Sequence, residues 1–159
     1  GKPVIVHGDG SSLWTMTFNE DFARGLIGLL GNPHAIGEVF QIMSDESLTW
    51  NQIYKAVADA LGVPFKPYYI SSTYLNDIAP KEYDIEGNLI GDKAASVVFD
   101  CAKLKRAVPD YQATTRFEEG VRKCIDYILA HPEYQEEDPE FDAWCDKVIN
   151  ALEEVKKQF

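Results

Sequence analysis

The residues best suited to bind a small molecule lie in the first turn of the chain, Gly8-Asp9-Gly10, and in the extended run after it. A carboxylate in such a turn can accept a hydrogen bond from a substrate hydroxyl, and Trp14 can form the aromatic wall of a pocket. Both residues also have a structural interpretation, because Asp in a tight turn commonly bonds its own backbone and tryptophan commonly anchors a core. The turn is therefore a candidate binding site with both interpretations open.

A second pair of charged residues, Asp92 and Lys93, follows the flexible Gly91. This pair can contact a substrate or cover its pocket, and the alternative is an ordinary solvated loop. Other chemistry finds little support, because the histidines lack a nucleophile or carboxylate partner and the cysteines lack the paired spacing of a zinc site. We expect no catalytic residue and no metal ligand among His7, His34, His131, Cys101, Cys124 and Cys145.

Composition sets the class of protein. The 159 residues, 45% of them hydrophobic, suffice for one folded domain. The net charge of −11 opposes a phosphate backbone, so nucleic acid is not an expected partner. The chain has no apolar run of membrane-spanning length and no signal peptide, and its odd number of cysteines suits a reducing compartment, so we expect a cytoplasmic protein without a membrane partner.

Helices are expected to position these residues. Capping boxes of the form Thr-x-x-Glu/Gln, apolar stripes at helical spacing and Gly-Pro stops define them. The capping boxes are Thr17/Glu20, Thr49/Gln52 and Thr115/Glu118, and the predicted helices cover 18–30, 50–61, 72–78, 101–107, 116–131 and 139–155.

Few strands are expected. Val4–Val6 reads as a strand, Phe65–Ile70 as an extended segment, and Glu38–Met43 and Ala95–Phe99 as further short strands. The weak pattern between Pro80 and Asp92 predicts a mobile surface loop. The fold class is therefore mixed α/β and rich in helix, with an acidic link opening a final segment at residues 133–159.

The order of several short motifs resembles one enzyme family. A Gly-Asp-Gly turn, an Asp-initiated helix, a Gly-x-x-aromatic-x-Ile strand, a Leu-Gly helix end and a Glu-Glu-Gly helix follow one another as in the C-terminal, substrate-binding part of extended short-chain dehydrogenases/reductases, the NAD-dependent epimerase/dehydratase group. The resemblance covers residues 3–132 and implies the C-terminal portion of a Rossmann-type fold. The matching motifs are Gly8-Asp9-Gly10, Asp21-Phe22-Ala23, Gly37–Ile42, Leu61-Gly62, Asp100, Lys103, Pro109 and Glu118-Glu119-Gly120.

The resemblance also implies a substrate, which is a small molecule such as a sugar derivative. Trp14 and Thr15 stand where the family has an Arg-Asp-aromatic triplet, and that arginine is understood to clamp the diphosphate of a nucleotide sugar. An indole cannot form paired charged hydrogen bonds, so a nucleotide sugar fits this chain poorly. We expect the substrate-binding residues to be Asp9, Trp14, Thr15, Asp92 and Lys93.

The family's hydride chemistry needs a glycine-rich turn between a strand and a helix, and a Tyr-x-x-x-Lys pair. No such turn is evident, and none of the eight tyrosines has a lysine four residues later. We therefore expect an inactive substrate-binding fragment of an NAD(P)-dependent epimerase, dehydratase or reductase. It would bind no cofactor itself, and its missing N-terminal domain would bind NAD or NADP.

Alternative functions remain open at this point. The chain can be an interaction module that offers the apolar stripe of its last helix to a partner. RNA binding, as in some plastid relatives of the family, is opposed by the charge. Separation from a cofactor domain would also leave the edge of the strand at 39–43 exposed, which favours a homodimer of the fragment.

Overall fold

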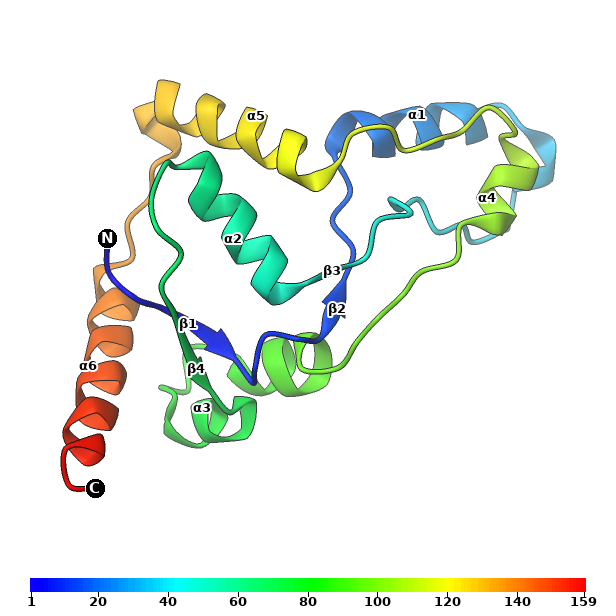
Figure 1. Ribbon diagram of the computed structural model, residues 1–159. Coiled ribbons are helices and arrows are strands. Elements are labelled where there is room, and N and C mark those ends of the chain that lie inside the picture. The colour runs from blue at the N-terminus through cyan, green and yellow to red at the C-terminus, as the bar shows by residue number, and fades with distance from the viewer.

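The computed structural model describes residues 1–159, and 52% of them are helical, which confirms a helix-rich mixed α/β fold (Figure 1). The elements are β1 (Val4–His7), β2 (Leu13–Trp14), α1 (Asn19–Leu29), the 3₁₀-helix η1 (Pro33–Ala35), β3 (Leu48–Thr49), α2 (Trp50–Ala60), β4 (Pro67–Ile70), α3 (Ser72–Ile78), the π-helix η2 (Glu86–Lys93), α4 (Ala102–Ala107), α5 (Phe117–Ala130), the 3₁₀-helix η3 (Pro132–Tyr134) and α6 (Pro139–Lys156). None of these helices is both long and apolar enough to cross a bilayer.

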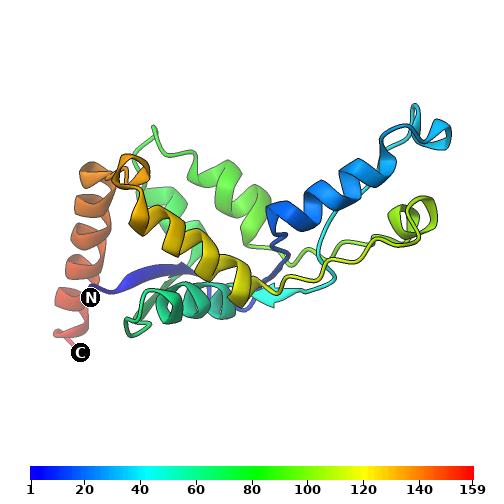
Figure 2. The ribbon, with the colours of Figure 1, turned by 90° about the horizontal axis from the view of Figure 1, so that it is seen from above.

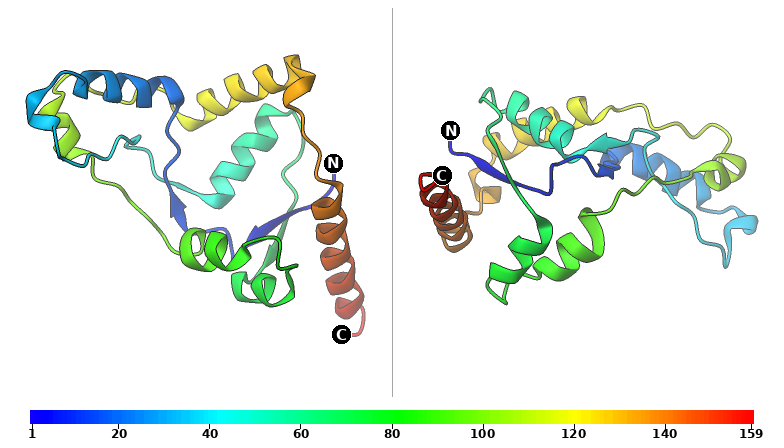
Figure 3. Two further views of the ribbon diagram at one scale, coloured as in Figure 1. Left: turned by 180° about the vertical axis from the view of Figure 1, so that it is seen from behind. Right: turned by 60° about the horizontal axis from the view of Figure 1, so that its bottom comes forward.

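Two small sheets carry the strands. β1 and β4 pair in parallel, with Val4 opposite Pro67 and His7 opposite Ile70. β2 and β3 form a two-residue antiparallel ladder in which Trp14 is opposite Leu48. The view from behind in Figure 3 shows β1 beside β4, with α6 running past them.

The last helix, α6, packs on its own chain. Val148 forms a core cluster with Ile70 of β4 and Leu75 of α3, and Trp144 and Leu152 extend it. The apolar stripe of the predicted helix is thus largely used inside the molecule, and the interaction-module hypothesis loses the surface on which it depended. Asp138 caps this helix as expected, since its carboxylate accepts the N–H of Phe141 at 3.0 Å.

The opposite end of the molecule is thinner. α1, η1 and α4 project away from the two sheets (Figure 2). The hydrophobic cluster at this end has three buried members, Ile42, Leu104 and Tyr111. Gly25 lies against Ile42 and Tyr111, where a Cβ would have to displace a neighbour.

One predicted capping box forms and two do not. Thr49 and Gln52 cap α2 in both directions. Thr17 does not cap α1, because its hydroxyl instead accepts the N–H of Ser44 at 2.9 Å. Thr115 does not cap α5 either. The capping prediction was wrong wherever the threonine binds a segment distant in sequence.

The first turn of α5 is held by carboxylates from elsewhere. Glu46 accepts the N–H of Phe117 at 2.8 Å. The fully buried Asp21 of α1 accepts the N–H groups of Thr114 and Thr115 at 3.2 and 3.0 Å. These contacts fix α1, the 44–47 loop and α5 relative to one another.

The structure also differs from the sequence-based expectation at two predicted strands and one predicted loop. Glu38–Met43 is extended but pairs with no strand. Ala95–Phe99 is not a strand either, because Leu13 makes only two hydrogen bonds to it: the Leu13 carbonyl accepts the N–H of Val97, and the Leu13 N–H donates to the Ser96 hydroxyl oxygen. The predicted surface loop contains the π-helix η2, whose start is fixed by the Asp84 carboxylate accepting the N–H of Gly87 at 3.0 Å.

Candidate functional site

The glycine turn joins β1 to β2. Gly8 and Gly10 adopt φ angles of 60° and 70°, which favour glycine. Between them the Asp9 carboxylate accepts the N–H of Ser11 at 2.9 Å and also its hydroxyl. Hydrogen bonds from the Ser11 hydroxyl and amide lower the pKa of Asp9, so the carboxylate is charged and engaged in its own turn. The structural interpretation of Asp9 is the one the geometry supports.

Asn51 in the first turn of α2 fixes the shape of this turn. Its backbone N–H donates to the Gly10 carbonyl at 3.0 Å, and its amide nitrogen donates to the Asp9 carbonyl at 2.9 Å. The Tyr69 hydroxyl of β4 donates to the Asn51 side-chain oxygen at 3.0 Å. The glycine turn is therefore preorganised from α2. Sequence reasoning missed Asn51, because one asparagine next to a helix cap carries no local signal of this contact.

The end of η2 docks on the same turn through a backbone atom. The Lys93 carbonyl accepts the Ser12 hydroxyl at 2.8 Å and lies 3.1 Å from Nε2 of His7. Because a carbonyl only accepts, Nε2 carries the proton and donates. Burial lowers the pKa of His7, whose side chain is almost fully enclosed, so the neutral ring is favoured. His7 has a structural role here, joining β1 to η2.

The side chains of Asp92 and Lys93 turn back on η2. The Lys93 ammonium lies 3.3 Å from the Asp92 carboxylate and donates to the Asn88 carbonyl at 3.2 Å. Both side chains remain partly exposed. The structure thus brings the Lys93 carbonyl to His7 and Ser12, which flank the glycine turn, while the charged groups of Asp92 and Lys93 pair with each other.

Trp14 is part of a row of aromatic rings. Its ring centroid lies 6.1 Å from that of Trp50 and 6.4 Å from that of Phe99, which it meets edge to face. Trp50 continues the row to Tyr54 at 6.0 Å. Trp14 is half-buried and the next residue, Thr15, is buried. Trp14 thus anchors β2 through its neighbouring rings, and the residue is only partly buried.

An apolar cavity of about 200 Å³ lies beside β1, between α2, α3, η2 and α6. Burial raises the pKa of both the Tyr54 phenol and the Cys145 thiol, so each is neutral. No pair of groups there is set up for proton transfer. The cavity is lined by Val4, Ile5, His7, Tyr54, Leu75, Ile85, Leu89, Phe141, Trp144 and Cys145.

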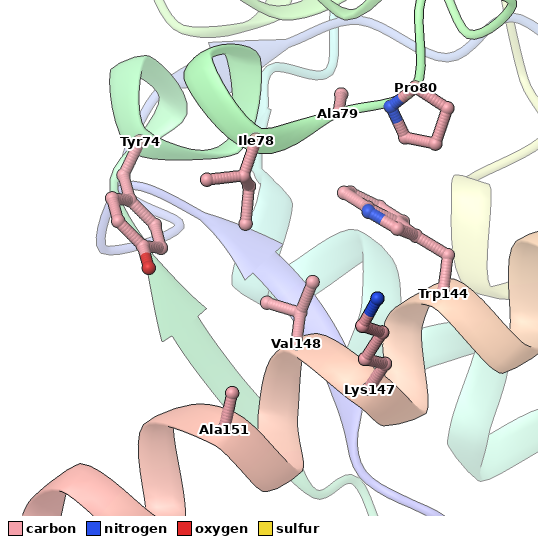
Figure 4. A pocket seen from close by; sticks show the side chains of 8 residues that line it. All are labelled: Tyr74, Ile78, Ala79, Pro80, Trp144, Lys147, Val148 and Ala151. Carbon is pink, nitrogen blue, oxygen red and sulfur yellow. The ribbon is translucent and has the colours of Figure 1, made fainter.

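A second groove, of about 410 Å³, lies between α3 and α6 (Figure 4). Ile78 of α3 and Val148 of α6 point toward each other across it, and Lys147 is its one charged lining residue. This groove offers apolar contact and a single cation, which is too little for acid–base chemistry.

The residues do not fit a dinucleotide cofactor. The glycine turn leads into β2, whereas a pyrophosphate cradle leads into the N-terminus of a helix. Gly25, Gly28 and Gly31 do repeat at the spacing Gly-x-x-Gly-x-x-Gly, but they lie within and directly after α1. No cluster of three or more His, Cys, Asp or Glu side chains that could hold a metal ion is present.

The comparisons with known proteins agree with the family resemblance of the sequence motifs. No family model matches the chain. It is 30% identical to a 2'-dehydrokanamycin reductase of Streptomyces kanamyceticus over 112 residues, 70% of this chain and 31% of that protein. It is 28% identical to a dTDP-glucose 4,6-dehydratase of Neisseria gonorrhoeae over 131 residues, 81% of this chain and 35% of that protein. The chain thus spans about a third of the length of these relatives.

Solved structures share the fold. An epimerase from Methanothermobacter thermautotrophicus superposes with a TM-score of 0.64 and 22% identity, over 83% of this chain and 34% of that one. The UDP-glucuronic acid 4-epimerase of Bacillus cereus, in complex with UDP-glucuronic acid and NAD, gives 0.60 and 22%, over 81% of this chain and 36% of that one. The relatives and structural neighbours are epimerases, dehydratases and a reductase of the NAD-dependent epimerase/dehydratase group, the extended short-chain dehydrogenases/reductases, and this chain matches the C-terminal part of such an enzyme.

Proposed function

We propose that this chain is the substrate-binding part of an NAD(P)-dependent epimerase, dehydratase or reductase that acts on a sugar derivative. Residues 3–132 form that part, and residues 133–159 add the link and α6, which supports β1 and β4. The observation that carries the proposal is the glycine turn followed by Trp14. The turn is fixed by Asn51, and the Ser12 hydroxyl after it donates to the Lys93 carbonyl. By the resemblance of the motifs, Trp14 stands where the family has its diphosphate-binding arginine.

Trp14 favours a particular kind of substrate. Its neutral ring, on a residue that is only partly buried, can stack on the apolar face of a sugar ring, whereas it offers a diphosphate no charged hydrogen bonds. In this proposal Trp14 forms the wall of the pocket, the buried Thr15 supports it, and Asp92 and Lys93 form the rim. Asp9 shapes the turn rather than binding the substrate.

The cofactor and the proton-transferring residues belong, in this proposal, to the rest of a longer protein. That part would supply the glycine-rich turn for NAD or NADP and the Tyr-x-x-x-Lys pair. The structures of the Bacillus cereus epimerase hold NAD, which supports NAD as the first cofactor to test.

Two measurements test the proposal. Calorimetry should detect no NAD or NADP binding to the 159-residue chain, whereas micromolar binding would contradict the assignment of the cofactor to the other part. In the complete gene product, Trp14→Ala should raise the KM for the sugar substrate at least tenfold and leave the Kd for NAD unchanged. The matched control is Tyr127→Ala, an exposed aromatic residue on α5. An unchanged KM for Trp14→Ala would remove Trp14 from the pocket.

A further inference from the structure

The groove between α3 and α6 is separate from the glycine turn. It depends on α6, which follows the part of the chain in which the family motifs were found. Ile78 and Val148 face each other across it, with Pro80 and Trp144 at one end and Tyr74 at the other (Figure 4). Its volume of about 410 Å³ lies within the range of small-molecule pockets. The groove thus has the size and the apolar walls of a ligand site.

The polar side-chain groups that line this groove can all donate a hydrogen bond. Lys147 contributes an ammonium group, Trp144 an indole N–H and Tyr74 a hydroxyl. Trp144 and Lys147 are three residues apart on α6, and the Lys147 side chain lies beside the indole ring (Figure 4). No carboxylate lines the groove. Its polar end is therefore complementary to a negatively charged acceptor.

Lys147 has no acidic partner in the protein. On a helix, a carboxylate reaches a lysine from three or four residues away, and none of these positions on α6 is acidic. Other carboxylates of α6 are paired elsewhere, since Asp146 lies 2.5 Å from Lys2 and Glu153 lies 2.6 Å from Lys156. The charge of Lys147 is therefore available to a ligand. The four neighbouring positions hold Ala143, Trp144, Asn150 and Ala151.

We propose that this groove binds a small aromatic monocarboxylate. The carboxylate accepts hydrogen bonds from the Lys147 ammonium and the Trp144 N–H, and the aromatic body lies between Ile78 and Val148. One cation matches one negative charge, whereas the net charge of −11 opposes a ligand with several. This site goes beyond the proposed function and does not depend on it, because it uses no residue of the glycine turn.

Calorimetry with two matched probes tests the proposal on the 159-residue chain. Naphthalene-2-carboxylate should bind with a Kd of about 1 mM or lower, as befits a ligand of its size. Naphthalene-2-carboxamide has the same ring system without the charge and should bind about fivefold more weakly, because the ion pair it lacks is partly exposed.

Variants locate the two probes in the groove. Lys147→Gln should weaken carboxylate binding about fivefold and remove the preference over the carboxamide, whereas Lys147→Arg should retain it. The matched control is Lys81→Gln, which removes the charge of another exposed lysine that lies outside the groove lining and should leave both Kd values unchanged. Ala151→Trp should fill the groove and abolish binding of both probes. Lys147 and Ala151 are exposed, so these changes leave the core intact.

Three outcomes would overturn the proposal. The first is that neither probe binds. The second is an equal Kd for the two probes, or an equal loss of affinity in Lys81→Gln and Lys147→Gln, because either result would leave no specific contact with Lys147. The third is a dimer in sedimentation velocity that Ala151→Trp dissociates, because the groove would then be occupied by a second copy of the chain.

Discussion

The Asp21 carboxylate of α1 accepts the backbone N–H of Thr115 at 3.0 Å, across most of the chain. It also accepts the N–H of Thr114 and is paired with Arg24. Burial by itself would raise the pKa of Asp21, but the hydrogen bonds from Thr115 and Thr114 and the charge of Arg24 outweigh it and lower the pKa. A buried carboxylate satisfied in this way joins α1 to the start of α5.

Replacing Asp21 with Asn should destabilise the protein by about 2–3 kcal/mol, because an amide replaces one acceptor oxygen with a donor that faces another N–H. Urea unfolding measures this loss. Glu20→Gln, on the exposed side of the same helix turn, is the control and should cost well under 1 kcal/mol. Equal stability of the two variants would contradict the role of Asp21.

The same carboxylate predicts a pH dependence. Its pKa in the folded state lies below the value of about 3.9 in an unfolded chain, so its contribution is complete above that value and is lost as the pH falls through the folded pKa. The stability gap between the native protein and Asp21→Asn should therefore be constant near neutral pH and shrink below about pH 4. A gap that persists at pH 2 would assign it to packing rather than to charge.

His7 predicts a second, milder transition. Burial lowers its pKa, so its contribution to stability is complete above an unfolded value of about 6.5 and decreases as the pH falls through the lower folded value. The Tm should fall between pH 7 and pH 5, and His7→Gln should reduce this slope. The exposed His34→Gln is the control and should keep the native slope. An NMR titration with His7 charging at or above about pH 6.5 would refute the prediction.

The packing of α6 predicts unequal effects along one helix stripe. Val148 is 7% exposed and Val155 is 48% exposed. Val148→Ala removes the equivalent of two buried methylene groups and should lower the free energy of unfolding by about 1.6 kcal/mol. Val155→Ala should lower it by well under 1 kcal/mol. Chemical denaturation of both variants measures the difference. Similar losses of unfolding free energy for the two variants would indicate that α6 does not pack against β4 and α3.

The contact of Glu46 with α5 predicts the cost of a missing cap. Glu46→Gln loses a charged acceptor at the first N–H of α5 and the 2.8 Å ion pair with Arg116, and should cost about 1 kcal/mol. The neighbouring Asp45, which forms an exposed pair with Lys105, provides the control as Asp45→Asn. Circular dichroism during thermal unfolding reports both variants. A larger effect at Asp45 would contradict the assignment.

Sequence reasoning succeeds here where the determinants are local. The Thr49/Gln52 box and the stop at Gly62, whose φ is 68°, delimit α2 because both act within one turn of the helix. Asp138 likewise caps α6. Helix caps and stops of this kind are why the sequence predicts a helix-rich fold.

It fails where the partner is distant. The Thr17 hydroxyl accepts the N–H of Ser44, and the N–H of Thr115 donates to Asp21. Capping rules that consider only local sequence therefore misassign both threonines. The segment 39–43 has the alternation of a strand but no neighbour to pair with, and strand formation depends on that neighbour. In the candidate site, the turn was found from its glycines, whereas the Asn51 contact became visible only in three dimensions.

The parallel pairing of β1 with β4 has a consequence for the order of folding. Residues 8–66 lie between the two strands, so their ladder forms only after a long loop closes, whereas α2 forms from near neighbours. The buried side of α6 rests on β4 and α3 and has no site to dock on until that closure is complete. The C-terminal helix should therefore be the last element to become protected in refolding, and the first 66 residues alone should leave β1 without its partner strand.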